Sequence, residues 1–201
     1  KRIMVGYNRR FSKPIQLSRN YIEDFSTALI SYNIYAGSLP KDHWLYDEKQ
    51  GGSRILSEPI HFLDVCNYIL SSYPKDYKIS VLRTNQEADK GVESFSLNLD
   101  YENGSIANIN YICNGSTDVP KEVISLNFSG NTIIINDFKS CILNNKKTLW
   151  SSRTQDKGFN FELESFLTAI KENKNSPIDI NDIIQTTEMM IDINEKVNQS
   201  I

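Results

Sequence analysis

Residues 94–113, SFSLNLDYENGSIANINYIC, decide the fold class. Apolar and polar side chains alternate in both halves of this stretch, the apolar ones being Phe95, Leu97, Leu99 and Tyr101, then Ala107, Ile109, Tyr111 and Cys113. Such alternation is typical of a β-strand with one buried face. The Asn-Gly pair between the halves is a tight-turn signal. The stretch therefore predicts an antiparallel hairpin.

Further strands are predicted on both sides of this hairpin. Residues 122–128 are expected to pair with 132–137 across a Gly-Asn turn, and 141–143 with 148–150. Residues 27–36 and 78–84 are also predicted strands. Together they predict a large, mainly antiparallel open sheet, which usually has one packed and one exposed face.

Four helices are predicted, over residues 13–24, 58–70, 161–172 and 181–197. The second has Ser57 in a favourable N-cap position and Pro59 in its first turn, where proline is tolerated. Its apolar residues surround the helix, which is typical of a buried helix. The fold class predicted is α+β, with helices packed on one face of the sheet.

The composition favours one globular domain. The chain has 201 residues, a mass of 23.0 kDa and a formal net charge of −3 with pI near 5.5, so nothing indicates a nucleic-acid partner. No apolar segment reaches the roughly 20 residues that span a bilayer, so no membrane partner is expected. Cys66, Cys113 and Cys141 are odd in number and each lies in an apolar run. We expect buried free thiols and a cytoplasmic location.

Residues 42–64, DHWLYDEKQGGSRILSEPIHFLD, hold most of the chemically capable side chains. Glu58, His61 and Asp64 are each three residues apart on the predicted helix, and so roughly on one side of it. Ionisable groups on a buried helix are costly unless they are paired, solvated or used on a ligand. One helical histidine with carboxylates is a poor zinc set, so no metal is expected.

Opposed influences act on His61. The helix N-terminus favours a neutral imidazole, whereas the carboxylates of Glu58 and Asp64 favour imidazolium. Such a balance could hold the pKa of His61 near neutrality, as suits a general acid/base. A core histidine with structural carboxylates around it explains the same residues equally well. Both interpretations remain open at this stage.

Four segments resemble a known family: VGYNRRF at 5–11, AGSLPKDHWLYD at 36–47, GGSRILSEPIHFLD at 51–64 and SPIDI at 176–180. They are similar to the C-terminal domain of the Gfo/Idh/MocA family of NAD(P)-dependent oxidoreductases, especially its sugar and inositol dehydrogenase-like branch. The resemblance implies a C-terminal fold like those of dihydrodipicolinate reductase and glyceraldehyde-3-phosphate dehydrogenase. His61 matches the family's catalytic histidine. Many members carry an aspartate where this chain has Ser57.

The cofactor-binding half of that family is not in these 201 residues. The nine glycines form no G-x-G-x-x-G, and no Glu-Lys-Pro occurs. We therefore expect residues 1–201 to be a single C-terminal domain for substrate binding, catalysis and oligomerisation, lacking its N-terminal Rossmann domain. NAD or NADP would be bound mainly by that absent domain, and the fragment alone is expected to be inactive.

The resemblance implies hydride transfer between nicotinamide and a hydroxyl of a sugar, sugar nucleotide or cyclitol. His61 would take the hydroxyl proton, with Glu58 and Asp64 orienting it. Substrate contacts would come from Arg10, His43, Trp44 and Arg54. The alternative is a non-catalytic sugar-binding or dimerisation module on the same fold. In either case the exposed sheet face is expected to form a homo-oligomer.

Overall fold

The hairpin predicted from residues 94–113 is confirmed. In the computed structural model, which describes residues 2–22, 27–40, 43–47, 50, 54–82 and 94–199, β3 (Ser94–Tyr101) pairs antiparallel with β4 (Ile106–Ile112). Phe95 lies opposite Tyr111, and Leu99 lies opposite Ala107. The alternating apolar side chains are buried on one face, so the hairpin pattern fixes which face the helices must cover.

Eight described strands form one open sheet in the order β2-β3-β4-β1-β5-β6-β7-β8. Every neighbouring pair is antiparallel except β1 and β4. The mainly antiparallel sheet is therefore confirmed. The remaining strands are β1 (Ala28–Tyr35), β2 (Pro74–Leu82), β5 (Glu122–Phe128), β6 (Asn131–Asn136), β7 (Ser140–Leu143) and β8 (Lys147–Ser151).

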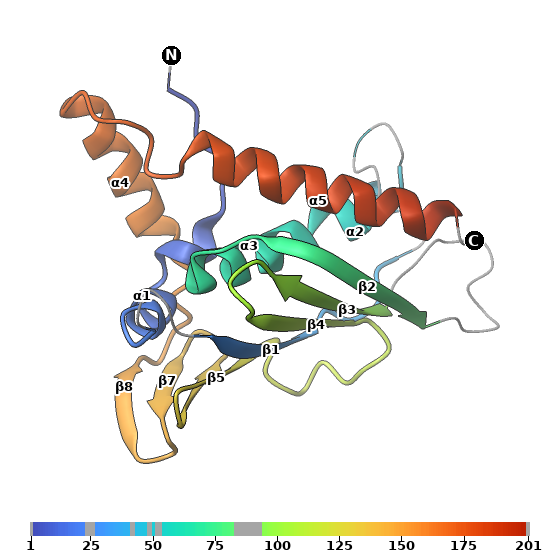
Figure 1. The fold of residues 1–201 in the computed structure, drawn as a ribbon, viewed down its shortest axis with the longest axis horizontal. Coiled ribbons are helices and arrows are strands. Elements are labelled where there is room, and N and C mark those ends of the chain that lie inside the picture. The colour runs from blue at the N-terminus through green and yellow to red at the C-terminus, as the bar shows by residue number, and fades with distance from the viewer. Residues whose placement is uncertain are drawn as a thin grey trace.

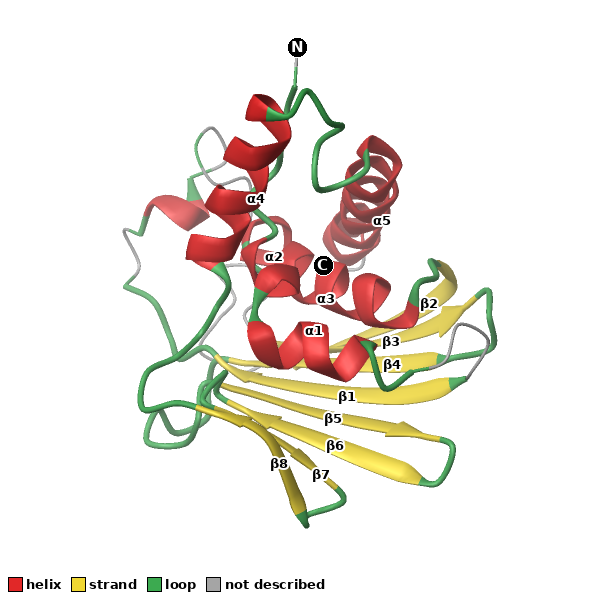
Figure 2. Cartoon of the chain, turned by 90° about the vertical axis from the view of Figure 1, so that its left-hand side faces the viewer, coloured by secondary structure: helices red, strands yellow, loops and turns green. Residues whose placement is uncertain are grey.

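The helices gather on one face of the sheet (Figure 2). Helix α3 (Pro59–Leu70) lies in the middle of this layer, with nine of its twelve residues buried, as its apolar pattern predicted. Figure 1 shows the long α5 crossing above it. The other helical elements are η1 (Asn8–Phe11), α1 (Lys13–Arg19), η2 (Trp44–Tyr46), α2 (Arg54–Ser57), α4 (Phe159–Lys171) and α5 (Ile180–Gln199). The α+β class with helices on one face is confirmed.

Several predicted boundaries were wrong. Ser57 is not an N-cap: it ends the short helix α2, so Glu58 becomes the residue before α3 and caps it with no side-chain hydrogen bond. Helix α1 ends at Arg19, before the predicted residue 24. Strand β2 begins at Pro74, earlier than predicted, because pairing with β3 extends it through an irregularity between Pro74 and Asp76. Residues 23–26 and 83–93 lie outside the described part of the chain.

Helix α4 has its apolar stripe on the outside. Phe159, Leu163, Leu167 and Ile170 are all exposed, by 63%, 57%, 45% and 45% respectively, and their spacing places them on one side of the helix. The residues that α4 buries are Glu162 and Ala169. The helical periodicity was recognised from the sequence, but its direction relative to the core was not.

The three cysteines, Cys66, Cys113 and Cys141, are buried thiols that form no disulfide, as predicted. Met190 is fully buried in the core, which also contains the inward faces of the central strands and α3. Among the described residues, no helix has the length and apolarity to cross a bilayer.

Candidate active site around His61

The candidate site forms where the first turn of α3 meets one end of the sheet. Strands β1 and β4 are parallel and finish at this end, and β5 begins there. Ile34 on β1 consequently has Tyr111 of β4 on one side and Glu122 of β5 on the other. The 3₁₀ turn η1 contributes Arg9, which pairs with Glu122. Residues far apart in the sequence thus surround His61.

Glu122 is a fully buried carboxylate with four donors. Arg9 donates to both of its oxygens, through Nε at 2.8 Å and Nη2 at 2.9 Å. Lys157 Nζ donates at 2.8 Å, and the Tyr32 hydroxyl donates as well. Burial alone would raise the pKa of Glu122, but Arg9 and Lys157 hold it at about 2. The carboxylate is therefore ionised at pH 7.

Glu58 belongs to a second network, which also contains Arg54. The Tyr111 hydroxyl donates to Glu58 and accepts from Arg54 Nε at 2.8 Å. Arg54 Nη2 donates to the Gly37 carbonyl at 2.8 Å. Arg54 is only 3% exposed, and its Nη1 is buried with no hydrogen-bond partner among the described residues. The structure thus brings the candidate residues Glu58 and Arg54 together through Tyr111, and Arg54 retains one donor nitrogen, Nη1, without a partner in that part of the chain.

His61 is half-buried between these two networks. Its ring meets Tyr7 edge-on, with centroids 6.0 Å apart, and its Nδ1 is buried without a partner in the part of the chain that the structure describes. Burial and then the charge of Arg9 lower its pKa to about 4, while Glu122 and Glu58 oppose this less strongly. The predicted pKa near neutrality is therefore wrong. Desolvation and a neighbouring cation outweigh the carboxylates, so the imidazole is neutral at pH 7.

Asp64 and Arg10 face away from this arrangement and pair with each other. Arg10 binds both oxygens of Asp64 and also donates to Asp182 on α5 at 2.8 Å, and Tyr73 donates to the same Asp182. Burial raises the pKa of Asp64 to about 6 against the pull of Arg10, so both partners are charged at pH 7. Arg10 is 5% exposed, which fits a brace between α3 and α5 rather than the substrate contact expected from the sequence.

Glu58, His61 and Asp64, which the helical spacing placed on one side of the helix, therefore do not form one network. Glu58 hydrogen-bonds to the sheet and Asp64 to η1, and neither hydrogen-bonds to His61 within the part of the chain that is described. Sequence reasoning missed Arg9, Glu122 and Tyr111. The adjacent arginines at positions 9 and 10 were a sequence signal for Arg9. Glu122 had no such signal, because only the pairing of the strands brings it near His61.

Trp44 is the first residue of η2 and His43 is its N-cap, and η2 packs against α2. Trp44 is 54% exposed, and the two rings are 5.7 Å apart. His43 Nδ1 accepts the Leu45 amide at 3.3 Å, so His43 caps the turn. An exposed indole beside the helix that carries Arg54 offers a flat surface to a ligand. The Gly51-Gly52 pair lies outside the described residues.

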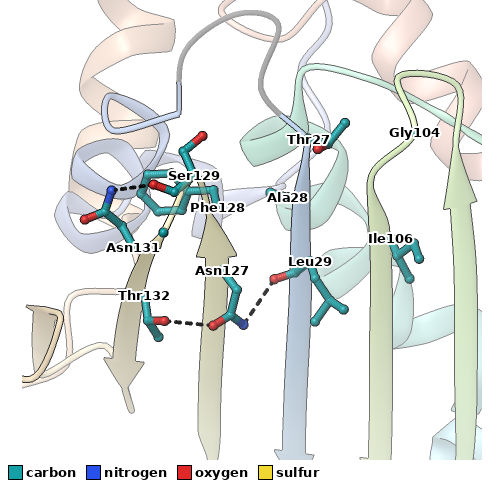
Figure 3. Close-up of a pocket in the computed structure, with 11 residues that line it drawn as sticks. Thr27, Ala28, Leu29, Gly104, Ile106, Asn127, Phe128, Ser129, Asn131 and Thr132 are labelled. Atoms are coloured by element: carbon teal, nitrogen blue, oxygen red, sulfur yellow. Dashed lines mark hydrogen bonds between the residues drawn. The ribbon is translucent and has the colours of Figure 1, made fainter.

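A cavity of about 570 Å³ lies at the opposite end of β1 (Figure 3). Asn127 crosses its floor, accepting from Thr132 Oγ1 at 2.9 Å and donating to the Leu29 carbonyl at 3.5 Å. Leu29 and Glu122 lie near opposite ends of their strands, roughly 15–20 Å apart along the sheet. This cavity is thus separate from the His61 site.

Comparisons with known proteins place the fold. No protein-family model matches the chain, and no curated protein matches its sequence. Among solved structures, aldose-aldose oxidoreductase from Caulobacter crescentus is similar over the whole chain, with a TM-score of 0.78 and 12% identity. A dehydrogenase from Clostridium difficile is similar over 96% of the chain, with a TM-score of 0.74 and 17% identity. UDP-N-acetylglucosamine 3-dehydrogenase from Acidithiobacillus ferrooxidans is similar over 95%, with a TM-score of 0.74 and 15% identity.

The chain spans only 63%, 62% and 60% of these three structures. All three are oxidoreductases of the Gfo/Idh/MocA type, so the resemblance recognised in the sequence is confirmed for the fold. At such low identities the likeness extends no further than the fold. The chain has the fold of the C-terminal domain of Gfo/Idh/MocA-type oxidoreductases.

Proposed function

We propose that this chain is the substrate-binding domain of an NAD(P)-dependent oxidoreductase that acts on a sugar, sugar nucleotide or cyclitol hydroxyl. The observation that carries the proposal is the state of His61: a neutral, half-buried imidazole whose Nδ1 has no partner within the described ranges. His61 lies between the hydrogen-bond network of Glu122 and that of Glu58. In the second network, Arg54 Nη1 is buried without a partner among the described residues. Two of the similar structures, the aldose-aldose oxidoreductase and the UDP-N-acetylglucosamine 3-dehydrogenase, are named for a sugar and a sugar nucleotide, which supports this substrate class.

His61 has the chemistry of a proton acceptor. When the substrate hydroxyl loses its proton to the neutral imidazole, the O–H electron pair forms the carbonyl, and hydride leaves the same carbon. The nicotinamide, when bound, accepts that hydride. Glu58 would polarise the ring from the start of α3, and Asp64 would keep α3 in place through Arg10. Within this chain no residue is proposed to hold the cofactor.

The substrate would be held by side chains that have a hydrogen-bond donor or an exposed aromatic surface to offer. Arg54 Nη1 offers donors to a hydroxyl, carboxylate or phosphate oxygen. Trp44 offers an exposed indole that could stack on the apolar face of a sugar ring. His43 supports that indole by capping the same turn.

The outward stripe of α4 suits a partner domain. The similar structures have more than a third of their length beyond the part this chain matches. Residues at the start of the chain are fixed beside α4: Arg2 Nε donates to the Lys174 carbonyl at 2.6 Å, and Ser176 Oγ donates to the Ile3 carbonyl at 2.9 Å. We therefore assign the stripe to an N-terminal nicotinamide-binding domain.

The uncovered sheet face suits a second copy of the chain. It presents uncharged polar side chains in register, including Asn33, Asn108 and Asn110, with Asn110 Nδ2 donating to Asn33 Oδ1 at 2.9 Å. An amide is both donor and acceptor, so such a face can pair with itself about a twofold axis. Sedimentation analysis should give a dimer for the wild type and a monomer for Asn110→Arg. Equal masses would rule out this face.

Two measurements test the enzymatic proposal. In the present chain, titration with UDP-N-acetylglucosamine, glucose or myo-inositol should shift the NMR signals of His61 and the Trp44 indole, but not those of the sheet hairpin β7–β8. In a longer polypeptide that carries a nicotinamide-binding domain, His61→Ala should slow single-turnover hydride transfer by about 100-fold or more. Lys146→Ala, in the exposed turn between β7 and β8, is the control. A rate near wild type for His61→Ala would refute the acid/base role.

A non-catalytic sugar-binding or dimerisation module is the second candidate, and one observation favours it. A pKa of about 4 makes His61 a weak base, because efficient proton transfer needs a pKa near the working pH. Sugar-induced shifts at His61 without hydride transfer in the longer polypeptide would support this candidate.

A further inference from the structure

Arg54 differs in its partners from the two arginines of η1. Arg9 and Arg10 each bind a buried carboxylate through two of their nitrogens. Arg54 is at least as deeply buried, but its side chain donates to two uncharged oxygens, the Tyr111 hydroxyl and the Gly37 carbonyl. No ion pair joins Arg54 to a carboxylate within the described ranges. This buried guanidinium thus lacks the direct counter-charge that the other two have.

Several N–H groups of Arg54 are unused. A guanidinium carries five N–H donors. One on Nε and one on Nη2 are used, which leaves both N–H groups of Nη1 and one of Nη2 without an acceptor among the described residues. Adjacent N–H groups of a guanidinium fit the two oxygens of a carboxylate or a phosphate. The unused part of Arg54 is therefore suited to an oxyanion rather than to a single hydroxyl.

The surroundings of His61 contain more cations than carboxylates. The two networks beside it hold three cations and two carboxylates, namely Arg9, Lys157 and Arg54 with Glu122 and Glu58. Asp64 and Asp182 are partners of Arg10 and belong to neither network. Three minus two leaves one positive charge, in a chain whose formal net charge is −3. A local excess of positive charge attracts an anionic ligand.

We propose that the substrate carries a carboxylate or phosphate group and that Arg54 is the residue that binds it. This inference names the substrate class of the proposed dehydrogenase site, and so it rests on the proposed function. The carboxylate in the same network, Glu58, is separated from Arg54 by the Tyr111 hydroxyl. An uncompensated buried charge is costly, and a bound oxyanion would compensate it directly.

A neutral sugar would not meet this requirement. A hydroxyl can accept from Nη1, but it brings no charge to the buried guanidinium. Because Arg54 is buried, salt screens its interaction with a bound anion only weakly. The exposed indole of Trp44 lies on η2, which packs against the helix that carries Arg54, and it offers a surface for the rest of the sugar. The charge of Arg54 thus selects among sugars.

The test compares three probes that share one sugar ring: glucose, glucuronate and glucose 1-phosphate. Isothermal titration calorimetry of the 201-residue chain should show at least one of the two charged probes binding about 10-fold or more tightly than glucose. A preference for glucuronate identifies a carboxylate as the group that Arg54 binds. A preference for glucose 1-phosphate identifies a phosphate, and titration with inorganic phosphate then shows whether that group binds without the sugar.

Three variants assign the preference to Arg54. Arg54→Met should reduce it to about 2-fold or less, because the positive charge and the N–H donors are both removed. Arg54→Lys keeps the charge but not the planar pair of donors, so the preference should fall by about 3-fold or more. Because lysine preserves the buried charge, this variant decides the matter if Arg54→Met does not fold. Arg153→Met, which removes an exposed arginine, is the matched control and should keep the full preference.

Two results would overturn the proposal. One is a wild type that binds neither charged probe more tightly than glucose. The other is a preference that stays unchanged in every Arg54 variant whose amide spectrum is that of a folded protein. Either result leaves the dehydrogenase proposal standing if glucose shifts the NMR signals of His61. Conversely, a preference that depends on Arg54, without hydride transfer in the longer polypeptide, would support the anion site and count against the dehydrogenase.

Discussion

The backbone of Gly158 lies directly against the carbonyl oxygen of Asn8, where α4 begins beside η1. Gly158 has a φ of +82°, and a Cβ there would also fall 2.6 Å from the Ser12 amide nitrogen. On the same side, Asn8 Nδ2 donates to the Lys157 carbonyl at 2.7 Å. This close approach holds Lys157 next to Glu122, and so ties the start of α4 to the candidate site.

Gly158→Ala is expected to lower the free energy of unfolding by about 3 kcal/mol or more, because both the left-handed backbone and the contact with Asn8 oppose a methyl group. Gly130→Ala is the matched control. Gly130 has a φ of +76°, but nothing lies within 4 Å of its would-be Cβ, so only the backbone cost of about 1 kcal/mol remains. Urea denaturation measures both. Equal losses would contradict a tight junction at Asn8.

Glu122→Gln should cost about 3–5 kcal/mol of stability, because Arg9 and Lys157 would lose the carboxylate that compensates them in a buried site. Glu172→Gln removes the same charge from an exposed pair with Lys174, and it should cost less than about 1 kcal/mol. Chemical denaturation of both variants at pH 7 compares them directly. Similar losses would show that the Glu122 cluster is no more than a surface pair energetically.

Acid should remove the stability contributed by His61 and by Glu122 in two successive steps, while Asp64, with its pKa raised to about 6 in the folded protein, offsets part of the first. His61 binds its proton at about pH 6.5 when unfolded but only at about pH 4 when folded, so the stability it contributes above pH 6.5 is lost as the pH falls toward 4. Glu122 has a folded pKa of about 2 against 4.5 unfolded, so its contribution disappears as the pH falls from 4.5 toward 2. Each step amounts to about 3 kcal/mol at most.

His61→Gln should abolish the first of these steps and leave the second. Between pH 7 and 4 the free energy of unfolding of the wild type should therefore fall relative to that of the variant by up to about 3 kcal/mol. Asp64, whose pKa is raised to about 6 in the folded protein, acts in the opposite direction in both proteins and cancels in this difference. His43→Gln is the control and should follow the wild type. A fall of equal size in the His61 variant would mean that His61 is not held neutral in the folded state.

Two leucine truncations should distinguish the outward stripe of α4 from the core. Leu163 is 57% exposed on α4, so Leu163→Ala should change the free energy of unfolding by no more than about 0.5 kcal/mol. Leu63 is fully buried on α3, so Leu63→Ala should cost about 2–5 kcal/mol. Denaturation of both variants in the present chain provides the comparison. A large loss for Leu163→Ala would show that the stripe is already packed.

The sequence determined the hairpins of the sheet, since period-two alternation and turn signals such as Asn103-Gly104 are local and specify antiparallel pairing and the inward face. The parallel pairing of β1 with β4 has no such local signal. The sequence likewise identified α3 as buried, because its apolar residues surround the helix. Boundaries were less well predicted. Ser57 looks like a cap in isolation, but α2 reaches it from the other side, and β2 is lengthened by its pairing with Tyr101.

The candidate site, too, could be predicted from the sequence only in part. His61 could be chosen from the sequence as a histidine on a buried helix, and Trp44 and Arg54 stand close enough in sequence to be grouped with it. Only the tertiary structure brought Glu122 to Arg9, 113 residues away, and joined Glu58 to Tyr111 across 53 residues. Side-chain partners depend on strand register and helix docking, which act over distances that local spacing does not encode. For that reason the spacing of the residues suggested a pKa near neutrality for His61. Burial and the charge of Arg9, which is distant in the sequence, lower that pKa and leave the imidazole uncharged at pH 7.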